Sequence, residues 1–167
     1  MKKKLSLIII ALFIAAWHSP AVANSDSPQD EYKALKQQAR KAGGSSKLAG
    51  SQYQRLLELK YMLGGDDGQP LPLKEARELA QLEITARKKG GISKLSEQQY
   101  QRLLALRIMK GDCYNQPLPP AEADEMALLQ IKARRLGGES RLPVAANQRL
   151  RELRGKICRN GSANPFF

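Results

Sequence analysis

The sequence has few of the residues that most often build catalytic or metal sites. Its 167 residues include one histidine, two cysteines and 5% aromatic residues. The histidine, His18, lies in an N-terminal segment that we expect the cell to remove. The remaining chain then has no histidine for acid–base catalysis or zinc binding, and two cysteines are too few for an all-cysteine zinc site. We therefore expect no metal, no cofactor and no enzymatic activity.

The N-terminal segment is typical of a secretory signal peptide covering residues 1–23. Lys2–Lys4 precede an apolar run of 13 residues, Leu5–Trp17, and small residues follow up to Ala23. This order of charge, apolar core and small residues predicts cleavage after Ala23. An uncleaved anchor is disfavoured because so short a run cannot cross about 30 Å of hydrocarbon. The mature chain, 24–167, is expected to be periplasmic or secreted, with no transmembrane segment.

The rest of the chain repeats itself with a period of 47 residues and no gaps. The recurring blocks are Ala39–Gly44 as Ala86–Gly91 and Ala133–Gly138, Tyr53–Leu57 as Tyr100–Leu104, and Gln69–Pro72 as Gln116–Pro119. A fixed period of this length indicates a repeat protein, in which each unit buries its apolar face against its neighbours. We divide the single domain into units of about 27–72, 73–119 and 120–163, followed by a short tail, 164–167.

Each unit is expected to form two helices. Apolar residues recur every three to four positions before a Gly-Gly pair and again after it, which is the spacing of one helix face. Ser96 followed by Gln99 fits a capping box, and glycine suits the left-handed conformation that ends a helix. The predicted helices cover about 28–42 and 50–63, 73–89 and 96–110, and 120–136 and 143–158. The fold class is therefore all-α: three tandem helix hairpins, six helices, forming a short solenoid or a compact helical array.

Positive charge is concentrated near the C-terminus. The chain has 28 Lys and Arg against 16 Asp and Glu. Residues 24–129 are nearly balanced, whereas 130–167 carry nine basic and two acidic residues. Because a surface of one sign attracts acidic partners, we take the last unit as the candidate binding surface; the alternative is that this end is only solvated. The candidate residues are Arg134, Arg135, Arg149, Arg151 and Arg154.

A column of basic residues recurs at the repeat period on the second helix of each unit. Its members are Lys60, Arg107 and Arg154. One interpretation is a row of cations that grips an extended acidic ligand, which makes Lys60 and Arg107 candidate binding residues. The other is structural: the cations complement the C-terminal end of the helix or pair with a glutamate such as Glu75 or Glu122.

Two other arginine columns also follow the period. The column just before the glycine pairs suits the C-terminal end of a helix dipole, and it comprises Arg40, Arg87 and Arg134. The column on the flank of the second helix is expected to be solvated, and it comprises Arg55, Arg102 and Arg149.

These features favour a non-catalytic binding or adaptor protein of the cell envelope. Helical arrays present extended surfaces, and the expected partner is an acidic protein or an anionic envelope component. Nucleic acid is disfavoured by the export signal and by the absence of Tyr from the last unit. An alternative is an enzyme that cleaves peptidoglycan with two carboxylates, as glycosidases do. The carboxylates available for that chemistry are Glu75, Glu78, Glu97, Glu122 and Glu125.

One short segment resembles a known family. The sequence Leu-Ser-Glu-Gln-Gln at Leu95–Gln99, followed by Leu103 and Leu106, is similar to the L-T-x-x-Q helix start of the periplasmic stress-chaperone family. The third unit lacks the glutamine of this pattern. The resemblance implies a helical protein that shields unfolded clients, so a holding chaperone is the alternative binding function.

The two cysteines, Cys113 and Cys158, are expected to form a disulfide in an oxidising compartment. Cys158 occupies the repeat position of Gly111, two residues before Cys113, so the ends of neighbouring helices would bring the thiols together. Closing a loop of this length stabilises the fold by about 3–4 kcal/mol through chain entropy. Mass spectrometry of the exported protein without reductant should find both cysteines in one crosslinked peptide. Free thiols would contradict the prediction.

Overall fold

The described part of the chain is entirely helical. In the computed structural model the described residues are 27–65, 68–111 and 116–157. Within them, six α-helices and three short 3-10 helices form, with no strand. The elements in order are α1 (Pro28–Lys41), η1 (Ser45–Lys47), α2 (Gly50–Met62), α3 (Leu73–Lys88), η2 (Ile92–Lys94), α4 (Glu97–Lys110), α5 (Pro120–Leu136), η3 (Glu139–Arg141) and α6 (Val144–Ile157). The predicted all-α class is confirmed for these residues.

Several features predicted from the sequence fall elsewhere in the chain. The predicted signal peptide, Cys113, Cys158 and the tail after residue 163 lie outside the described residues. Signal cleavage and the disulfide therefore stay predictions. The cations of the predicted binding surface up to Lys156 all lie inside the described ranges.

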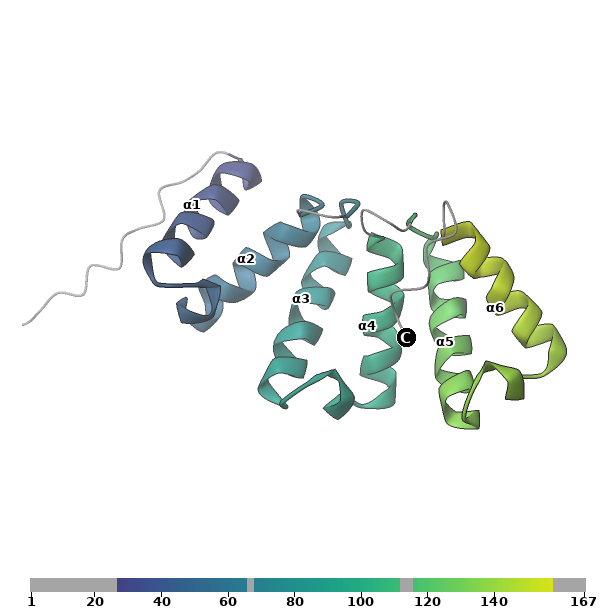
Figure 1. Ribbon diagram of the computed structural model, residues 1–167. Coiled ribbons are helices and arrows are strands. Elements are labelled where there is room, and N and C mark those ends of the chain that lie inside the picture. The colour runs from purple at the N-terminus through teal and green to yellow at the C-terminus, as the bar shows by residue number, and fades with distance from the viewer. Residues whose placement is uncertain (1–26, 66–67, 112–115, 158–167) are drawn as a thin grey trace, which may run out of the picture.

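The helices stand side by side in one row, and the chain reverses direction between them (Figure 1). α1, α3 and α5 run one way and α2, α4 and α6 run back, so η1, η2 and η3 lie along the lower edge of the view. The described linker residues before α3 and α5, 68–72 and 116–119, lie along the opposite edge. The three 3-10 helices begin at Ser45, Ile92 and Glu139, at intervals of 47 residues.

Local sequence accounts for where the helices begin and end. At the start of α4, Ser96 Oγ accepts a hydrogen bond from the Gln99 N–H at 3.3 Å, and Gln99 Oε1 accepts one from the Ser96 N–H at 3.1 Å. This is the predicted capping box. α5 ends at Gly137, whose φ of 81° is left-handed and is adopted by glycine without strain. The helix ends predicted from these residues are confirmed to within one or two positions.

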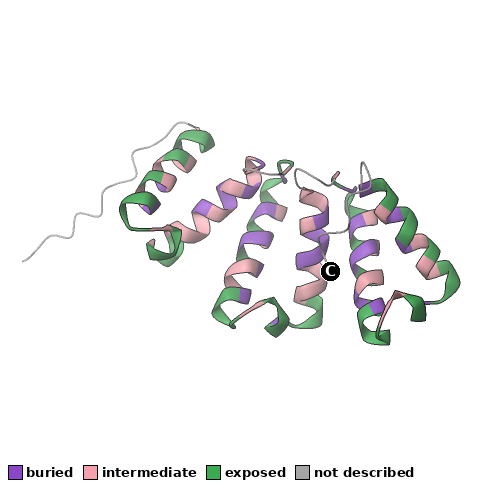
Figure 2. Ribbon diagram, in the orientation of Figure 1, coloured by how far each residue is buried: buried purple, intermediate pink, exposed green. Residues whose placement is uncertain are grey.

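The core consists mainly of leucine and alanine side chains on the faces that neighbouring helices turn toward each other (Figure 2). Leu103 and Leu106 of α4 are completely buried, as are Leu150 and Leu153 of α6. Two packings are the most extensive in the row, α2 against α3 and α4 against α5. Each of these joins the second helix of one predicted unit to the first helix of the next. Packing between units is therefore at least as important as packing within them.

Both linkers are held by backbone hydrogen bonds at the upper edge of the row. The Gln69 N–H donates to the Lys110 carbonyl at 2.8 Å, and the Gln116 N–H donates to the Ile157 carbonyl at 3.0 Å. Each bond satisfies a carbonyl at the C-terminal end of a helix, where no intrahelical partner exists. Leu71 and Leu118, two residues later in each linker, are buried. The Gln-Pro-Leu-Pro segments therefore anchor successive helices rather than only spanning between them.

Truncation of a core leucine tests the packing. Leu103→Ala removes a side chain with 0% exposure, and we expect it to lower the free energy of unfolding by about 2–5 kcal/mol, because the cavity cannot fully collapse. Leu128→Ala on α5, where the side chain is 52% exposed, is the control, with an expected change below about 0.5 kcal/mol. Urea unfolding followed by circular dichroism measures both. Equal changes would contradict the placement of α4 in the core.

Candidate functional site

An arginine–glutamate ion pair recurs three times between the two helices that flank each 3-10 helix. The pairs are Glu31–Arg55, Glu78–Arg102 and Glu125–Arg149, with Oε2–Nη2 distances of 2.7, 2.8 and 2.7 Å. In each pair the arginine Nε also donates to Oε1, at 2.8 to 3.0 Å. Two parallel hydrogen bonds fix the planar guanidinium against the carboxylate. The prediction that these three arginines are solvated is therefore wrong, because each finds its partner 24 residues earlier on the adjacent helix.

The ion pairs change the acidity of the groups that form them. A hydrogen bond from Arg55 lowers the pKa of Glu31, and a hydrogen bond from Arg149 lowers the pKa of Glu125. The same bonds raise the pKa of Arg55 and of Arg149. All four groups are thus charged at neutral pH. Arg149, a candidate binding residue, is occupied by this internal pair.

The column Lys60, Arg107 and Arg154 divides between two environments. Arg107 donates from Nη2 to Glu83 Oε1 of α3 at 3.1 Å, and Glu83 also accepts a hydrogen bond from the Tyr61 hydroxyl. Burial and this hydrogen bond raise the pKa of Tyr61, which stays protonated. Lys60 and Arg107 line one pocket of about 360 Å³, so the structure brings these two candidates together.

Arg154 lies apart from that pocket and pairs with Glu139 at the start of η3. The structural interpretation named Glu75 and Glu122 as examples of partners on the first helix of a unit. Arg107 pairs with another glutamate of such a helix, Glu83 in the middle of α3, whereas Arg154 reaches Glu139 in the turn after α5. Glu122 instead pairs with Lys156.

Two arginines stack on tyrosine rings where one predicted unit meets the next. The Arg87 guanidinium of α3 lies 5.3 Å from the centre of the Tyr53 ring of α2. The Arg134 guanidinium of α5 lies 5.5 Å from the centre of the Tyr100 ring of α4. A cation over an aromatic face is attracted by the ring quadrupole. Both arginines also lie in the last turn of their helices, as the dipole argument predicts. The tyrosine partners were missed, although tyrosine and arginine recur here at the same spacing.

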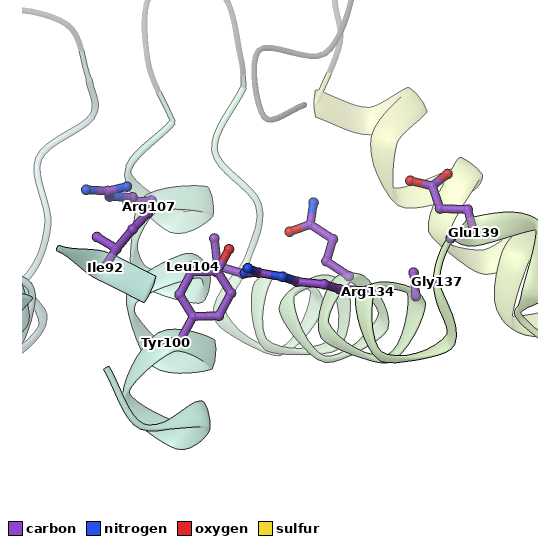
Figure 3. A pocket seen from close by; sticks show the side chains of 10 residues that line it. Ile92, Tyr100, Leu104, Arg107, Arg134, Gly137 and Glu139 are labelled. Carbon is purple, nitrogen blue, oxygen red and sulfur yellow. The ribbon is translucent and has the colours of Figure 1, made fainter. Parts of the chain in front are cut away.

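A pocket of about 480 Å³ opens beside the second of these stacks (Figure 3). Tyr100, Leu104 and Ala133 contribute apolar walls from α4 and α5. Arg134 extends toward the Tyr100 ring, whereas Arg107 and Glu139 lie on opposite sides of the pocket. The mixture of an apolar wall and charged groups suits an amphipathic side chain or a short peptide segment.

Carboxylates from earlier helices neutralise part of the basic C-terminal unit. Arg135 pairs with Glu97 of α4, and Lys156 pairs with Glu122 of α5. Lys132 and Arg151 are exposed, and within the described ranges no carboxylate lies at ion-pair distance from either. Two candidates in this unit, Arg134 and Arg151, are exposed and have no carboxylate at ion-pair distance in the described ranges. Arg134 stacks on the Tyr100 ring, and Arg151 has no such ring contact there.

The carboxylates considered for peptidoglycan cleavage are mostly engaged in ion pairs. The pairs are Glu78–Arg102, Glu97–Arg135, Glu122–Lys156 and Glu125–Arg149. The lowered pKa of Glu125 is opposite to the change that a general acid needs near neutral pH. Glu75 is half-buried, and among the described residues its Oε2 atom has no hydrogen-bond partner. Four of the five carboxylates therefore hold helices together.

No family model, no curated protein and no solved structure matches this chain. In the part of the chain that the structure describes, no helix is both long and apolar enough to cross a bilayer. In that same part, no three or more His, Cys, Asp and Glu side chains are grouped so as to hold a metal ion. The exposed cations and the pockets between helices are thus the features from which a function can be inferred.

The ion pairs predict how stability depends on pH. Glu31 and Glu125 have a pKa below their ordinary value of 4.5 in the folded chain, so the folded state binds their protons less tightly than the unfolded state. Their contribution to the free energy of unfolding is complete above pH 4.5 and disappears as the pH falls through the lower, folded-state pKa. In a Glu31→Gln/Glu125→Gln variant, chemical denaturation should show a shallower loss of stability with acid. Between pH 6 and 8 the two stability curves should run parallel, and an unchanged acid slope would contradict the assignment.

Proposed function

We propose that this chain is an exported, non-catalytic binding or adaptor protein of the cell envelope. Its partner is an acidic macromolecule, either an acidic protein or an anionic envelope component, and cations of the last unit bind it. The predicted signal peptide supports export to the periplasm or the medium, and nothing in the proposal requires a cofactor.

The proposal includes the organisation of the chain as three tandem helix hairpins in a short solenoid. The regular spacing of the 3-10 helices supports it, as does the glutamate–arginine pair that recurs at the same two positions in every unit. The matching hydrogen bonds of the two linkers are a third support. A repeat of this kind offers an extended surface rather than one enclosed site.

The exposed cations that remain after internal ion pairing carry the proposal. In the last unit these include Lys132 on α5 and Arg151 on α6, both exposed. Within the described ranges neither has a carboxylate at ion-pair distance. A solvated cation with no internal partner is free to meet an acidic group on another molecule, and such surfaces accelerate the encounter of opposite charges.

The pocket beside Tyr100 favours a second candidate, a holding chaperone for unfolded proteins. The pocket has a volume of about 480 Å³ and a largely apolar wall, and it opens to solvent at the junction of α4 and α5. Unfolded clients expose the apolar side chains that such a wall would cover. A chaperone would suppress the aggregation of unrelated denatured proteins, and Leu104→Ser would weaken that effect, whereas Arg151→Glu would not.

Reversal of the unpaired cations tests the binding function. Lys132→Glu/Arg151→Glu should reduce the affinity for poly-L-glutamate, a stand-in for an acidic polypeptide, by about tenfold or more, because attraction becomes repulsion. The matched control is Lys33→Glu/Lys74→Glu, which makes the same change of net charge on α1 and α3. Binding by the unaltered protein should fall steeply between about 50 and 300 mM salt. Fluorescence anisotropy measures all three affinities.

The same variants identify the partner in its natural setting. Crosslinking in the intact envelope should capture a species whose yield falls with Lys132→Glu/Arg151→Glu and not with the control pair. Capture that survives both the charge reversal and high salt would show that the last unit does not bind electrostatically.

A further inference from the structure

One edge of the helix row gathers cations from all three predicted units. This turn edge comprises residues 40–50, 87–97 and 134–144, which include the last turns of α1, α3 and α5, the three 3-10 helices and the starts of α2, α4 and α6. It contains ten Lys and Arg against two carboxylates. All ten cations are exposed. Figure 1 shows these segments following one another along the lower edge of the row.

The few acidic groups of the turn edge are already paired. Glu97 pairs with Arg135, and Glu139 pairs with Arg154. Nine of the ten cations have no carboxylate at ion-pair distance among the described residues. Arg87 and Arg134 stack on tyrosine rings, and Lys89 and Arg141 each donate a hydrogen bond to a neutral oxygen. The other five are exposed, and they are Arg40, Lys41, Lys47, Lys88 and Lys94. The turn edge is therefore positive over its whole length, not only in the last unit.

Helix dipoles explain only part of this charge. Cations in the last turn, such as Lys41 and Lys88, complement the negative C-terminal ends of α1 and α3. Lys47, Lys94 and Arg141 lie beyond the glycine pairs, in the 3-10 helices. There the starts of α2, α4 and α6 present positive dipole ends, which disfavour nearby cations. Arg141 donates from Nη1 to the Leu136 carbonyl at the C-terminal end of α5, at 3.3 Å. Among the described residues Lys47 and Lys94 make no such contact, so these two lysines oppose the local electrostatics and point to an anion outside the chain.

Exposed apolar side chains lie among the cations of the turn edge. Of the five large apolar side chains that are exposed in the described residues, three lie here: Ile92, Leu136 and Val144, with exposed fractions of 42%, 38% and 85%. They come from the second and third units, and each has a cation of the edge within three positions in the sequence. Cations beside apolar side chains match the chemistry of a membrane interface, where phosphates lie above the acyl chains.

We propose that the turn edge docks this protein on an anionic phospholipid bilayer. The lysine and arginine head groups lie at the level of the lipid phosphates, and Ile92, Leu136 and Val144 enter the boundary between head groups and acyl chains. An acidic protein accounts for the charge but not for the apolar side chains on a thin, extended edge. The inference deepens the proposed function and rests on it for an anionic envelope partner, but it assigns the contact to all three units.

Vesicle flotation tests the proposal with the protein purified in the form that the cell produces. Vesicles containing phosphatidylglycerol should carry the protein upward, whereas phosphatidylcholine vesicles should not. Each cation at an anionic surface strengthens binding about fivefold, so Lys47→Gln/Lys88→Gln/Lys94→Gln should weaken it roughly 100-fold. The matched control, Lys33→Gln/Lys74→Gln/Arg77→Gln, removes the same charge from exposed positions on α1 and α3 outside the edge and should weaken it less than about threefold.

A second variant separates apolar insertion from charge. Ile92→Ser/Val144→Ser leaves every cation in place and should remove the binding that persists at about 300 mM salt, because apolar contacts are not screened. Circular dichroism confirms that each variant keeps its helices before flotation.

Several results would overturn the inference. Equal losses in the edge and control variants would show that net charge alone attracts the protein, without a docking edge. Binding to poly-L-glutamate or to duplex DNA without binding to vesicles would assign the edge to another polyanion. With poly-L-glutamate this would leave the proposed binding function intact. Binding to neither vesicles nor poly-L-glutamate would overturn both proposals.

Discussion

The whole structure depends on the burial of leucine and alanine between helices that cannot cover themselves. The core around α3 draws Tyr61 from α2 and Leu103 from α4, and the core around α5 draws Leu104 from α4 and Leu150 from α6. Burial of one such leucine contributes about 1.5–3 kcal/mol. Each inner helix must therefore be covered on two sides, and this requirement forces the helices into a row rather than into separate hairpins.

Ion pairs and linker hydrogen bonds act on top of this packing by setting direction and register. The bidentate geometry of a glutamate–arginine pair, such as Glu78–Arg102 between α3 and α4, fixes how far one helix slides along the other. The linkers hold the helices at the other edge of the row. Gln69, which follows α2, donates to the last carbonyl of α4, and Gln116, which follows α4, donates to the last carbonyl of α6. Stacks such as Arg134 on Tyr100 then join one unit to the next.

The antiparallel order of the helices also determines where charges gather, so that the two edges of the row differ in charge. The helices α1, α3 and α5 have acidic residues in the first turn and basic residues in the last turn, as in α3 with Glu75 and Arg87. Because α1, α3 and α5 run the same way, their basic ends add up along one edge. Counting charges along the sequence placed the excess of positive charge in residues 130–167. The boundary at residue 130 falls inside α5, so Glu122 and Glu125 were counted apart from Lys156 and Arg149, the cations that they neutralise.

Composition, periodicity and turn chemistry were enough to determine the helical class and the positions of the helix ends. These properties depend on residues within a few positions of one another, and Ser96 with Gln99 or the glycines after α5 act through local backbone geometry. The ion-pair partners of the arginines could not be predicted from such local patterns. Arg102 and Glu78 are 24 residues apart, and the direction and packing of two helices decide whether they meet. The sequence alone thus determined which cations exist and which helices carry them. Only the tertiary structure decided which of them are bound internally and which form a positive edge, because that depends on distances between helices.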